Sequence, residues 1–581
     1  MLQLEGYPTL AKITAVLDAY LCRTHGKFFG PEAKRPVLDL KPYKDIHDHL
    51  WGTNRFSWRE MVLLDSPLLQ RLRNIHQTGL AYYVYPCARH SRFEHSIGVV
   101  TIASRVFDAI VQRHRGKMLQ IAAAVDGSCE PAEKIARLRQ ELRLAALLHD
   151  TGHSLYSHAS ERVYGKLSLL KDAVRELERF SGREKGAGEV ISFCLSQTAA
   201  VQGLLERAKI RVMHPETAPE FGTDVDIDHV SLLIIGRSKH PSLQFMGDII
   251  SSGFDADKLD YLLRDAIAAG LPLRYDVERY LTTVELRVGW LSDPKGELEA
   301  LYARAGTTGL ARQPAPPPQA EFPYYDEAVF LRLPKRSMNT IEQITICKLM
   351  LYSYIYHHKK VRAAEGFLGR LLTRVYGVWK ANGMTEEQVL EKFIGFTDAS
   401  LSGADFLESE TADVSEMSYR LVNRLLPRVV YEFPTTASGL ERRLVRDFFS
   451  RLGDEESGPA LVADLEREIG QELLRVDRKI ASCPEDAIWK AGIWFDLPKT
   501  PEFEGMDELV GEPDPTLLTR IADILPIGKW TEAYQAHRYT ARIYAFSEYV
   551  PQTATAAKLA MQRVTKITNE DYYRGCLRAR A

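Results

Sequence analysis

The chain has 581 residues, and its 75 Lys and Arg residues nearly balance its 77 Asp and Glu residues, giving a formal net charge of −2. That balance excludes a global basic field that would attract nucleic acid, so nucleic-acid binding stays open only through a local basic channel. The length exceeds that of one compact core, and we expect two or three folding units.

Helical periodicity dominates the chain, with apolar residues at three- and four-residue spacing in several long segments. In chain order, the predicted elements are helices at 134–148 and 172–180, strands at 284–288 and 328–333, and helices at 341–372 and 440–474. The expected fold is mostly α, with small β elements and a mainly helical C-terminal region.

Three ranges organise this pattern. Residues 1–40 form an expected N-terminal extension, 41–400 the main unit, and 401–581 a helical C-terminal region, for which a regulatory role is one hypothesis. A proline-rich segment that suits neither a helix nor a central strand predicts a surface excursion at about 303–325 inside the main unit.

The sequence predicts a cytoplasmic protein with no membrane segment. Its seven cysteines are scattered and form no Cys-x-x-Cys motif, which favours reduced thiols over a disulfide framework. The N-terminus lacks a basic segment followed by an apolar one, and no apolar run reaches the roughly 18 residues of a membrane span.

His149 and Asp150 directly follow an apolar helical segment at 142–148. Neighbouring side chains on a helix diverge by about 100°, so they rarely contact each other, but both can reach one external cation. A mixed imidazole and carboxylate shell suits Mn, Fe, Zn, Co or Ni, with Mg as a further candidate. A His-Asp pair at a helix end also arises by chance, so its neighbours decide the interpretation.

Two motifs flank this pair: Arg-Phe-Glu-His-Ser at 92–96 and Asp-Ala-Asp-Lys at 255–258. The order His, His-Asp, Asp resembles the HD superfamily of metal-dependent phosphohydrolases. The resemblance implies an HD-domain helical core within 41–400. The implied metal ligands are His95, His149, Asp150 and Asp257, and motif position alone selects the last of these from three nearby aspartates.

The residues that make up the motifs narrow the resemblance to one branch of the superfamily. Tyr-Tyr-Val-Tyr-Pro at 82–86 and His-Asp-Thr-Gly-His at 149–153 look like the deoxynucleoside triphosphate (dNTP) triphosphohydrolase branch, whose animal member carries SAM and HD domains. The likeness covers about 41–290 and resumes at 340–370. It implies hydrolysis of a dNTP to a deoxynucleoside and triphosphate.

The resemblance assigns His153 and His158 to catalysis, because a histidine near the scissile phosphate can donate a proton to the leaving oxygen. The alternative is a pair of exposed capping histidines. Related enzymes usually carry a further His-Glu pair after this motif, where this chain has Gly-Arg-Glu-Lys-Gly at 182–186. That departure keeps a catalytically weak nucleotide sensor as an alternative function.

Substrate positions also follow from the resemblance. They are Arg92, Lys258 and Lys348 for phosphate, Tyr261 and Asp265 for the deoxyribose, Gln77 for the 3′-hydroxyl, and Tyr352 and Tyr356 for the pocket wall. A tyrosine ring against C2′ would exclude a 2′-hydroxyl by crowding. The alternative for the cations is a solvated helix face, and for the tyrosines core packing.

A second constellation resembles the family's site for an activating nucleotide. Asp65, Gln70 and Arg73 have the spacing of that site, and Lys44 lies on the neighbouring strand, although Ile46 replaces the proline usual after the aspartate. The alternative is a surface helix with proline in its first turn. The resemblance implies a GTP or dNTP activator and a homo-oligomer, either a tetramer or a dimer of dimers.

The resulting hypothesis is a metal-dependent dNTP triphosphohydrolase. The rival within enzymes is an HD phosphohydrolase on another phosphoester, such as a nucleoside monophosphate, a cyclic dinucleotide or single-stranded nucleic acid.

Overall fold

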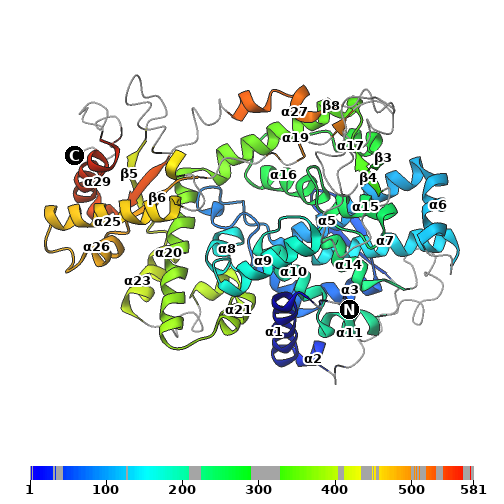
Figure 1. The fold of residues 1–581 in the computed structure, drawn as a ribbon, viewed down its shortest axis with the longest axis horizontal. Helices are drawn as coiled ribbons and strands as arrows, with labels where there is room; N and C mark the ends of the chain where they lie inside the picture. Colours follow the sequence, from blue (N-terminus) through cyan, green and yellow to red (C-terminus); the bar gives the residue numbers. More distant parts are fainter. Residues whose placement is uncertain are drawn as a thin grey trace. The chain divides into compact units, whose positions relative to one another are not determined.

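The structure, a computed structural model, is predominantly helical (Figure 1), which confirms the mostly α fold. It describes residues 2, 4, 6–30, 33, 43–125, 129–208, 224–289, 328–402, 411–433, 448, 450–452, 457–498, 503, 505–506, 509–510, 519–531, 541–566 and 576. The predicted proline-rich excursion at about 303–325 lies outside the described residues.

The chain divides into two compact units. Unit 1 comprises residues 1–348, 376–405 and 503–525, and unit 2 comprises 349–375, 406–502 and 526–581. The chain therefore enters each unit more than once. The division into residues 1–40, 41–400 and 401–581 remains a prediction about domain organisation.

Unit 1 is almost entirely helical. Its helices are α1 (Pro8–Thr24), α2 (Gly26–Phe29), α3 (Trp58–Leu64), α4 (Pro67–Gln70), η1 (Arg71–Asn74), η2 (Ala81–Tyr83), α5 (Arg92–Arg113), α6 (Arg115–Val125), α7 (Pro131–Leu148), α8 (His158–Tyr164), α9 (Ser168–Ser181), α10 (Ala187–Ser196), α11 (Ala199–Arg207), α14 (Ile227–Ile234), η4 (Pro241–Leu243), α15 (Gln244–Ile250), α16 (Ala256–Ala268), α17 (Val277–Thr283), η5 (Lys335–Ser337), α21 (Glu386–Gly395), η7 (Asp398–Ser402) and α27 (Ile521–Ile524). The helices predicted at 134–148 and 172–180 lie within α7 and α9.

The strands of unit 1 form small antiparallel pairs: β1 (Tyr43–Asp48) with β2 (Gly52–Ser57), β3 (Glu285–Gly289) with β4 (Ala328–Arg332), and β7 (Leu509–Val510) with β8 (Thr519–Arg520). The pair β3–β4 corresponds to the two predicted strands, with Glu285 opposite Arg332.

The packing of α5 against α16 positions the candidate site. A capping box formed by Ser91 and Glu94 starts α5, because each side chain accepts a backbone N–H of the other residue. Gly98 lets the two helices approach closely, since a Cβ there would lie 1.9 Å from Asp260 Oδ1. The first turns of α5 and α16 therefore lie close together.

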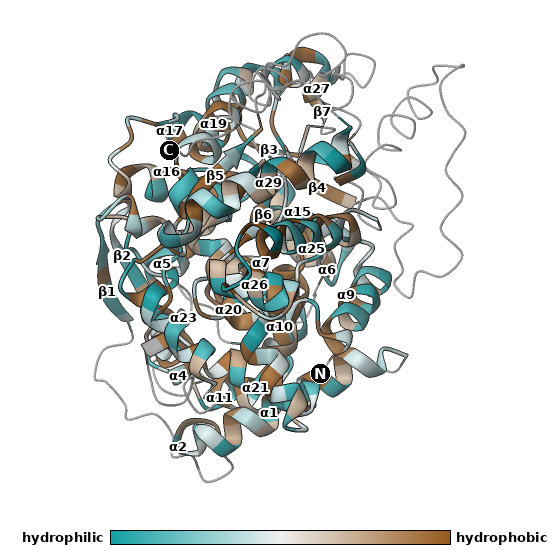
Figure 2. Cartoon of the chain, turned by 90° about the vertical axis from the view of Figure 1, so that its left-hand side faces the viewer, coloured by the Kyte–Doolittle hydropathy of each residue, from teal (hydrophilic) through white to brown (hydrophobic). Residues whose placement is uncertain are grey.

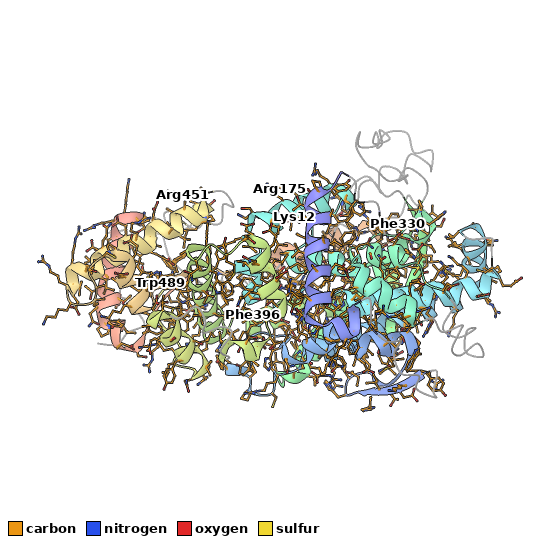
Figure 3. All side chains as sticks on the ribbon, turned by 90° about the horizontal axis from the view of Figure 1, so that it is seen from below. Lys12, Arg175, Phe330, Phe396, Arg451 and Trp489 are labelled. Carbon is orange, nitrogen blue, oxygen red and sulfur yellow. The ribbon has the colours of Figure 1, made fainter. Side chains whose placement is uncertain are left out.

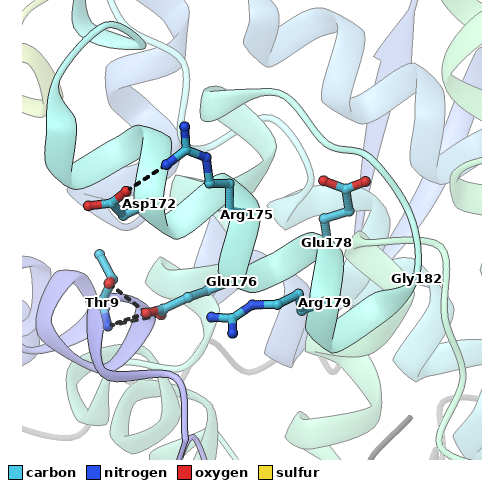
Figure 4. A pocket seen from close by; sticks show the side chains of 7 residues that line it. All are labelled: Thr9, Asp172, Arg175, Glu176, Glu178, Arg179 and Gly182. Carbon is cyan, nitrogen blue, oxygen red and sulfur yellow. Dashed lines mark hydrogen bonds and ion pairs between the residues drawn. The ribbon is translucent and has the colours of Figure 1, made fainter. Parts of the chain in front are cut away.

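Helix α9 is one of the helices that pack against the N-terminal helix α1. It buries Leu170 and Leu177 on one face and has charged residues on the other. Its ribbon accordingly has both hydrophobic and hydrophilic colours in Figure 2. Glu176, also buried, accepts the backbone N–H groups of Thr9 and Leu10 at 2.9 Å each, and Figure 4 shows its contact with Thr9. This carboxylate satisfies the free N–H groups at the start of α1.

The single helix predicted at 341–372 is wrong, because the segment contains two helices. They are α19 (Met338–Leu351) and α20 (Lys359–Ala381), separated by the π-helical turn η6 (Tyr352–Tyr356). His358 Nδ1 accepts the backbone N–H of Lys360 at 3.2 Å, so a side chain caps the start of the second helix.

Unit 2 packs helices around a three-stranded antiparallel sheet of order β5–β9–β6. Besides η6, its elements are α23 (Ala412–Val422), β5 (Arg428–Glu432), α25 (Gly458–Val476), α26 (Pro484–Ala491), β6 (Trp494–Asp496), β9 (Arg542–Ala545), η9 (Ser547–Tyr549) and α29 (Val550–Thr565). Trp494 stacks on Tyr544 at 4.9 Å between ring centroids. Trp489, labelled in Figure 3, lies under the guanidinium of Arg370 at 5.6 Å.

Within the helix predicted at 440–474, residues 448 and 450–452 are helical and α25 begins at Gly458, while residues 440–447, 449 and 453–456 lie outside the described residues. Among the described helices, none is long and apolar enough to cross a membrane.

Candidate metal centre

Three helices of unit 1 bring two imidazoles and two carboxylates to one point. His95 lies in the first turn of α5, His149 and Asp150 directly follow α7, and Asp257 lies in the first turn of α16. His95 Nε2 lies 2.9 Å from Asp257 Oδ1 and 3.6 Å from Asp150 Oδ2. His149 Nε2 lies 3.6 Å from Asp150 Oδ1 and 3.9 Å from Asp257 Oδ1. The four predicted ligands therefore lie together.

The state of the ring nitrogens fits a metal ion. Within the part of the chain that the structure describes, Nε2 of His95 and Nε2 of His149 are both buried without a hydrogen-bond partner. Buried polar atoms are normally bonded, so these nitrogens need another partner. One ligand atom each from His95, His149 and Asp257 lies within 4.8 Å of the others, and this nitrogen and oxygen set suits a divalent transition metal.

The other ring nitrogens are held in place. His95 Nδ1 donates to Asp260 Oδ2 at 2.8 Å, and His149 Nδ1 donates to the carbonyl of Ala146 at 2.7 Å. Each bond fixes the tautomer in which Nε2 carries the free lone pair that a metal requires. The sequence did not single out Asp260 for this role, because its register among the nearby aspartates was ambiguous.

Asp260 is itself held by a buried network. Trp51 Nε1 donates to one of its oxygens, and Arg264 Nε and Nη2 donate to both at 2.7 and 2.9 Å. Arg264 also donates to Asp48 at 2.9 Å. Burial raises the pKa of Asp260, but Arg264 and His95 lower it by more, so the carboxyl stays ionised and remains an acceptor.

The imidazole and carboxylate groups of the centre shift one another's pKa values. Burial lowers the pKa of His95, but the nearby carboxylates of Asp257 and Asp260 raise it by more, to about 10. Burial raises the pKa of Asp257, and the nearby imidazole of His95 lowers it by more, to about 2. A cation bound between these side chains would take the place of the proton on His95 Nε2.

Two predicted phosphate contacts lie beside the centre. Arg92, which is 2% exposed, donates through Nη1 to Asp150 and through Nε to Ser157 Oγ at 2.7 Å, and its Nη2 is buried without a partner among the described residues. Lys258 Nζ lies 3.0 Å from Asp255 Oδ2, which caps α16. Arg92 therefore has a donor left for a ligand oxygen.

The predicted catalytic histidines converge on Glu161. His158 Nδ1 lies 3.0 Å from Glu161 Oε2, and His153 Nδ1 lies 3.9 Å from the same oxygen. His153 is buried against Gly188, where a Cβ would lie 2.8 Å from its ring, and its Nε2 lies 3.4 Å from Asp150 Oδ1. The side chain of His158 is 72% exposed. Only His153 therefore belongs to the buried part of the site.

Two of the three predicted sugar contacts, Asp265 and Gln77, are hydrogen-bonded to His90. His90 Nε2 donates to Asp265 Oδ1 at 2.8 Å, and its carbonyl accepts the backbone N–H of Gln77 at 3.0 Å. Tyr261, half-buried, lies one helical turn before Asp265 on α16. The sequence pattern did not indicate His90, although it stands in the same segment as Arg92.

The remaining substrate positions fall in both units. Lys348 is buried in α19 as the last residue of the first segment of unit 1. Tyr352 and Tyr356 belong to unit 2, where their rings pack edge to face at 5.1 Å.

The predicted activator residues lie on the surface of unit 1. Arg73 Nε donates to Gln70 Oε1 at 2.8 Å, and its guanidinium lies 3.7 Å from the ring centroid of Phe93. Asp65 is exposed at the end of α3, and Lys44 lies on β1, which packs against that helix. The structure thus pairs Gln70 with Arg73 and places the other two on adjoining elements.

Unit 2 contains a cluster of cations that the sequence reasoning missed. Burial and the nearby charges of Arg428, Arg424 and Lys359 all lower the pKa of Lys360. The signal lay in the Lys-Lys pair after η6, but the two arginines come from beyond α23.

Comparison with known proteins first defines the class. The HD domain family matches residues 92–202, which contain His95, His149 and Asp150. A crystal structure of a hypothetical protein from Aquifex aeolicus has the same fold, with a TM-score of 0.52 and 19% identity over 88% of this chain and 99% of that one.

The relatives then narrow the family. The chain is 30% identical over 245 residues to a deoxynucleoside triphosphate triphosphohydrolase SAMHD1 homolog of Dictyostelium discoideum, covering 42% of this chain and 39% of that protein. It is 27% identical over 247 residues to SAMHD1 of Homo sapiens, covering 42% and 36%. An uncharacterized protein of Methanocaldococcus jannaschii is 26% identical over 338 residues, covering 57% and 49%. The chain thus spans about half or less of the length of these relatives, and its HD domain and these similarities support an HD-domain, dNTPase-like family.

Proposed function

We propose that the protein is a metal-dependent hydrolase that cleaves dNTPs into deoxynucleoside and triphosphate. The observation that carries this proposal is the pair of buried, unpartnered Nε2 atoms of His95 and His149 facing Asp257, beside the unused donor of Arg92. A divalent cation held there would neutralise phosphate oxygens and activate a water molecule.

The side chains around the centre have separable tasks. Arg92 and Lys258 would bind phosphate oxygens and so would present the α-phosphorus to an attacking water molecule. His158 would donate a proton to the departing 5′-oxygen, while the contact with Glu161 orients its ring. His153 packs against Gly188 beside Asp150, where it would contact a phosphate or assist catalysis.

Discrimination of the sugar would come from α16. Tyr261 would pack against C2′ and leave no room for a 2′-hydroxyl. Asp265 would accept a hydrogen bond from the 3′-hydroxyl, and Gln77 would donate one to it. His90 is hydrogen-bonded to both residues.

Activation by GTP or a dNTP, coupled to assembly into a tetramer or dimer of dimers, is part of the proposal. Gln70 and Arg73 offer amide and guanidinium groups to a base and its phosphates. Lys44 and Asp65, on the adjoining elements β1 and α3, complete the proposed activator site. The cytoplasm, where thiols stay reduced, is the proposed location.

Product analysis separates this reaction from the two alternatives. We expect deoxynucleoside and tripolyphosphate by chromatography when dNTPs are supplied with Mn, Fe, Co or Mg, and little turnover of NTPs, nucleoside monophosphates, cyclic dinucleotides or oligonucleotides. Orthophosphate or nucleoside monophosphate as the main product would favour the rival hydrolase. Bound nucleotide and metal without turnover would favour the sensor, for which the missing His-Glu pair is the supporting observation.

A further inference from the structure

We propose that Asp398 is a positioning residue that holds the loop between the metal ligand Asp150 and the catalytic His158. The inference rests on the proposed function, and it concerns how the reactive groups are held. Asp398 starts η7 and is buried at 8% exposure, far along the chain from the residues that it contacts.

The loop has a backbone conformation that its residues do not favour. Tyr156 and Ser157, which immediately precede His158, have φ angles of 50° and 56°. Residues with a Cβ rarely adopt positive φ, and two in succession need support from their surroundings. Ser157 directly precedes α8, so its conformation sets the direction in which that helix and His158 start.

Both carboxylate oxygens of Asp398 supply such support. Oδ1 accepts the backbone N–H of Tyr156 at 2.6 Å, and Oδ2 accepts the backbone N–H of His76 at 2.8 Å as well as His76 Nδ1–H. The rings of His76 and Tyr156 lie parallel within 9°, at 6.5 Å between centroids. One buried side chain thus joins the loop to the segment that precedes α5.

The contacts continue from His76 to the metal centre. Ser157 Oγ donates to the carbonyl of His76 at 2.8 Å and accepts Arg92 Nε at 2.7 Å. Arg92 in turn donates to Asp150. Asp398 therefore acts through His76 and Ser157 on two groups that the reaction needs, Arg92 and His158.

Loss of the Asp398 side chain should lower the rate of catalysis but leave metal binding intact. His95, His149 and Asp257 are placed by helices that Asp398 does not touch, so metal binding should persist. The loop can then relax from its positive φ angles, which moves His158 and releases Ser157 from Arg92. Misplacement of this kind lowers the rate far more than it lowers binding.

The test compares Asp398→Ala with Glu176→Ala, a matched control. Glu176, on α9, is also a buried carboxylate that accepts backbone N–H groups from a distant segment, but the segment that it holds is the start of α1 (Figure 4). We expect Asp398→Ala to lower kcat by about 10- to 100-fold with KM and metal content within about threefold of the unmodified protein. Asp398→Asn, which retains an acceptor for the Tyr156 N–H, should lose less. Glu176→Ala should keep kcat.

Hydrogen exchange gives a readout that does not need activity. Peptides covering 151–160 should exchange faster in Asp398→Ala and unchanged in Glu176→Ala, whose faster exchange should be confined to 7–12. If Asp398→Ala exchanges faster in 151–160 but keeps its kcat, the positioning role is wrong. Unchanged exchange, or loss of metal together with activity, would also overturn it. If the unmodified protein hydrolyses no dNTP, the proposed function fails, while the exchange comparison still decides whether Asp398 holds the loop.

Discussion

Asp260 accepts a hydrogen bond from His95 Nδ1 at 2.8 Å, and this contact turns the opposite ring nitrogen toward Asp257. The predicted metal ligand His95 is thus oriented by Asp260, which follows the neighbouring ligand Asp257 by one turn on α16. Arg264 keeps Asp260 ionised, so the orientation does not depend on the metal being bound.

Asp260→Asn should weaken metal binding about 10- to 100-fold, because an amide can present its NH2 group to His95 and allow the ring to turn. Titration calorimetry with Mn or Co measures this effect. Asp255→Asn is the control, since Asp255 caps α16 and an asparagine still caps a helix. Equal metal affinity in the Asp260 variant and the unmodified protein would show that the contact does not orient the ligand.

Tyr261→Ala should narrow the preference for dNTPs over NTPs by roughly tenfold, because the ring that crowds a 2′-hydroxyl is removed. Tyr261→Phe keeps the ring and should keep the preference. Competing dGTP with GTP in one reaction measures the ratio directly. A ratio that does not change in Tyr261→Ala would place the discrimination elsewhere.

Arg73→Ala should reduce stimulation by GTP or a second dNTP about tenfold and leave metal content unchanged, because Arg73 lies outside the metal centre. Arg175→Ala removes an exposed guanidinium from α9 and is the control. Light scattering with and without nucleotide follows assembly in the same samples. A strictly monomeric protein whose kinetics no nucleotide alters would exclude this regulation.

Cys347 gives a pH dependence of stability with a defined sign. Burial raises the pKa of its thiol to about 11 from an ordinary value of 9.0. The folded state therefore keeps the proton that the unfolded state loses, so the free energy of unfolding falls as pH rises from 9 toward 11, by at most about 1.4 kcal/mol per unit.

Urea unfolding at pH 8, 9 and 10 measures that slope. Cys347→Ala should show a shallower decline than the unmodified protein, whereas Cys87→Ala, at an exposed position, should not differ from it. Identical declines in all three proteins would mean that the thiol of Cys347 titrates freely in the folded state.

Much of the centre could be predicted from sequence because its residues stand in short ordered motifs. His149 and Asp150 are adjacent in the sequence, and the resemblance to the HD superfamily implied His95 and Asp257 from the order of the motifs. The helical fold followed from periodicity for the same reason, since amphipathic spacing is a local property.

The supporting residues could not be predicted in this way. Asp260, His90 and Asp398 act through contacts with segments far along the chain, and such pairings depend on how helices pack. The break between α19 and α20 was missed because His358 caps the second helix with its side chain, while the apolar spacing runs on without interruption. The spacing of apolar residues does not by itself predict a side-chain cap of this kind.

The most direct test of the proposed reaction follows the oxygen atom of water. The protein is incubated with Mn, a dNTP and water labelled with oxygen-18, and the masses of the products are measured by mass spectrometry. In the proposed reaction water attacks the α-phosphorus, so the label should enter the released tripolyphosphate and not the deoxynucleoside, and Asp150→Ala should release neither product. Label in orthophosphate or pyrophosphate, with a shortened nucleotide left behind, would contradict a dNTP triphosphohydrolase.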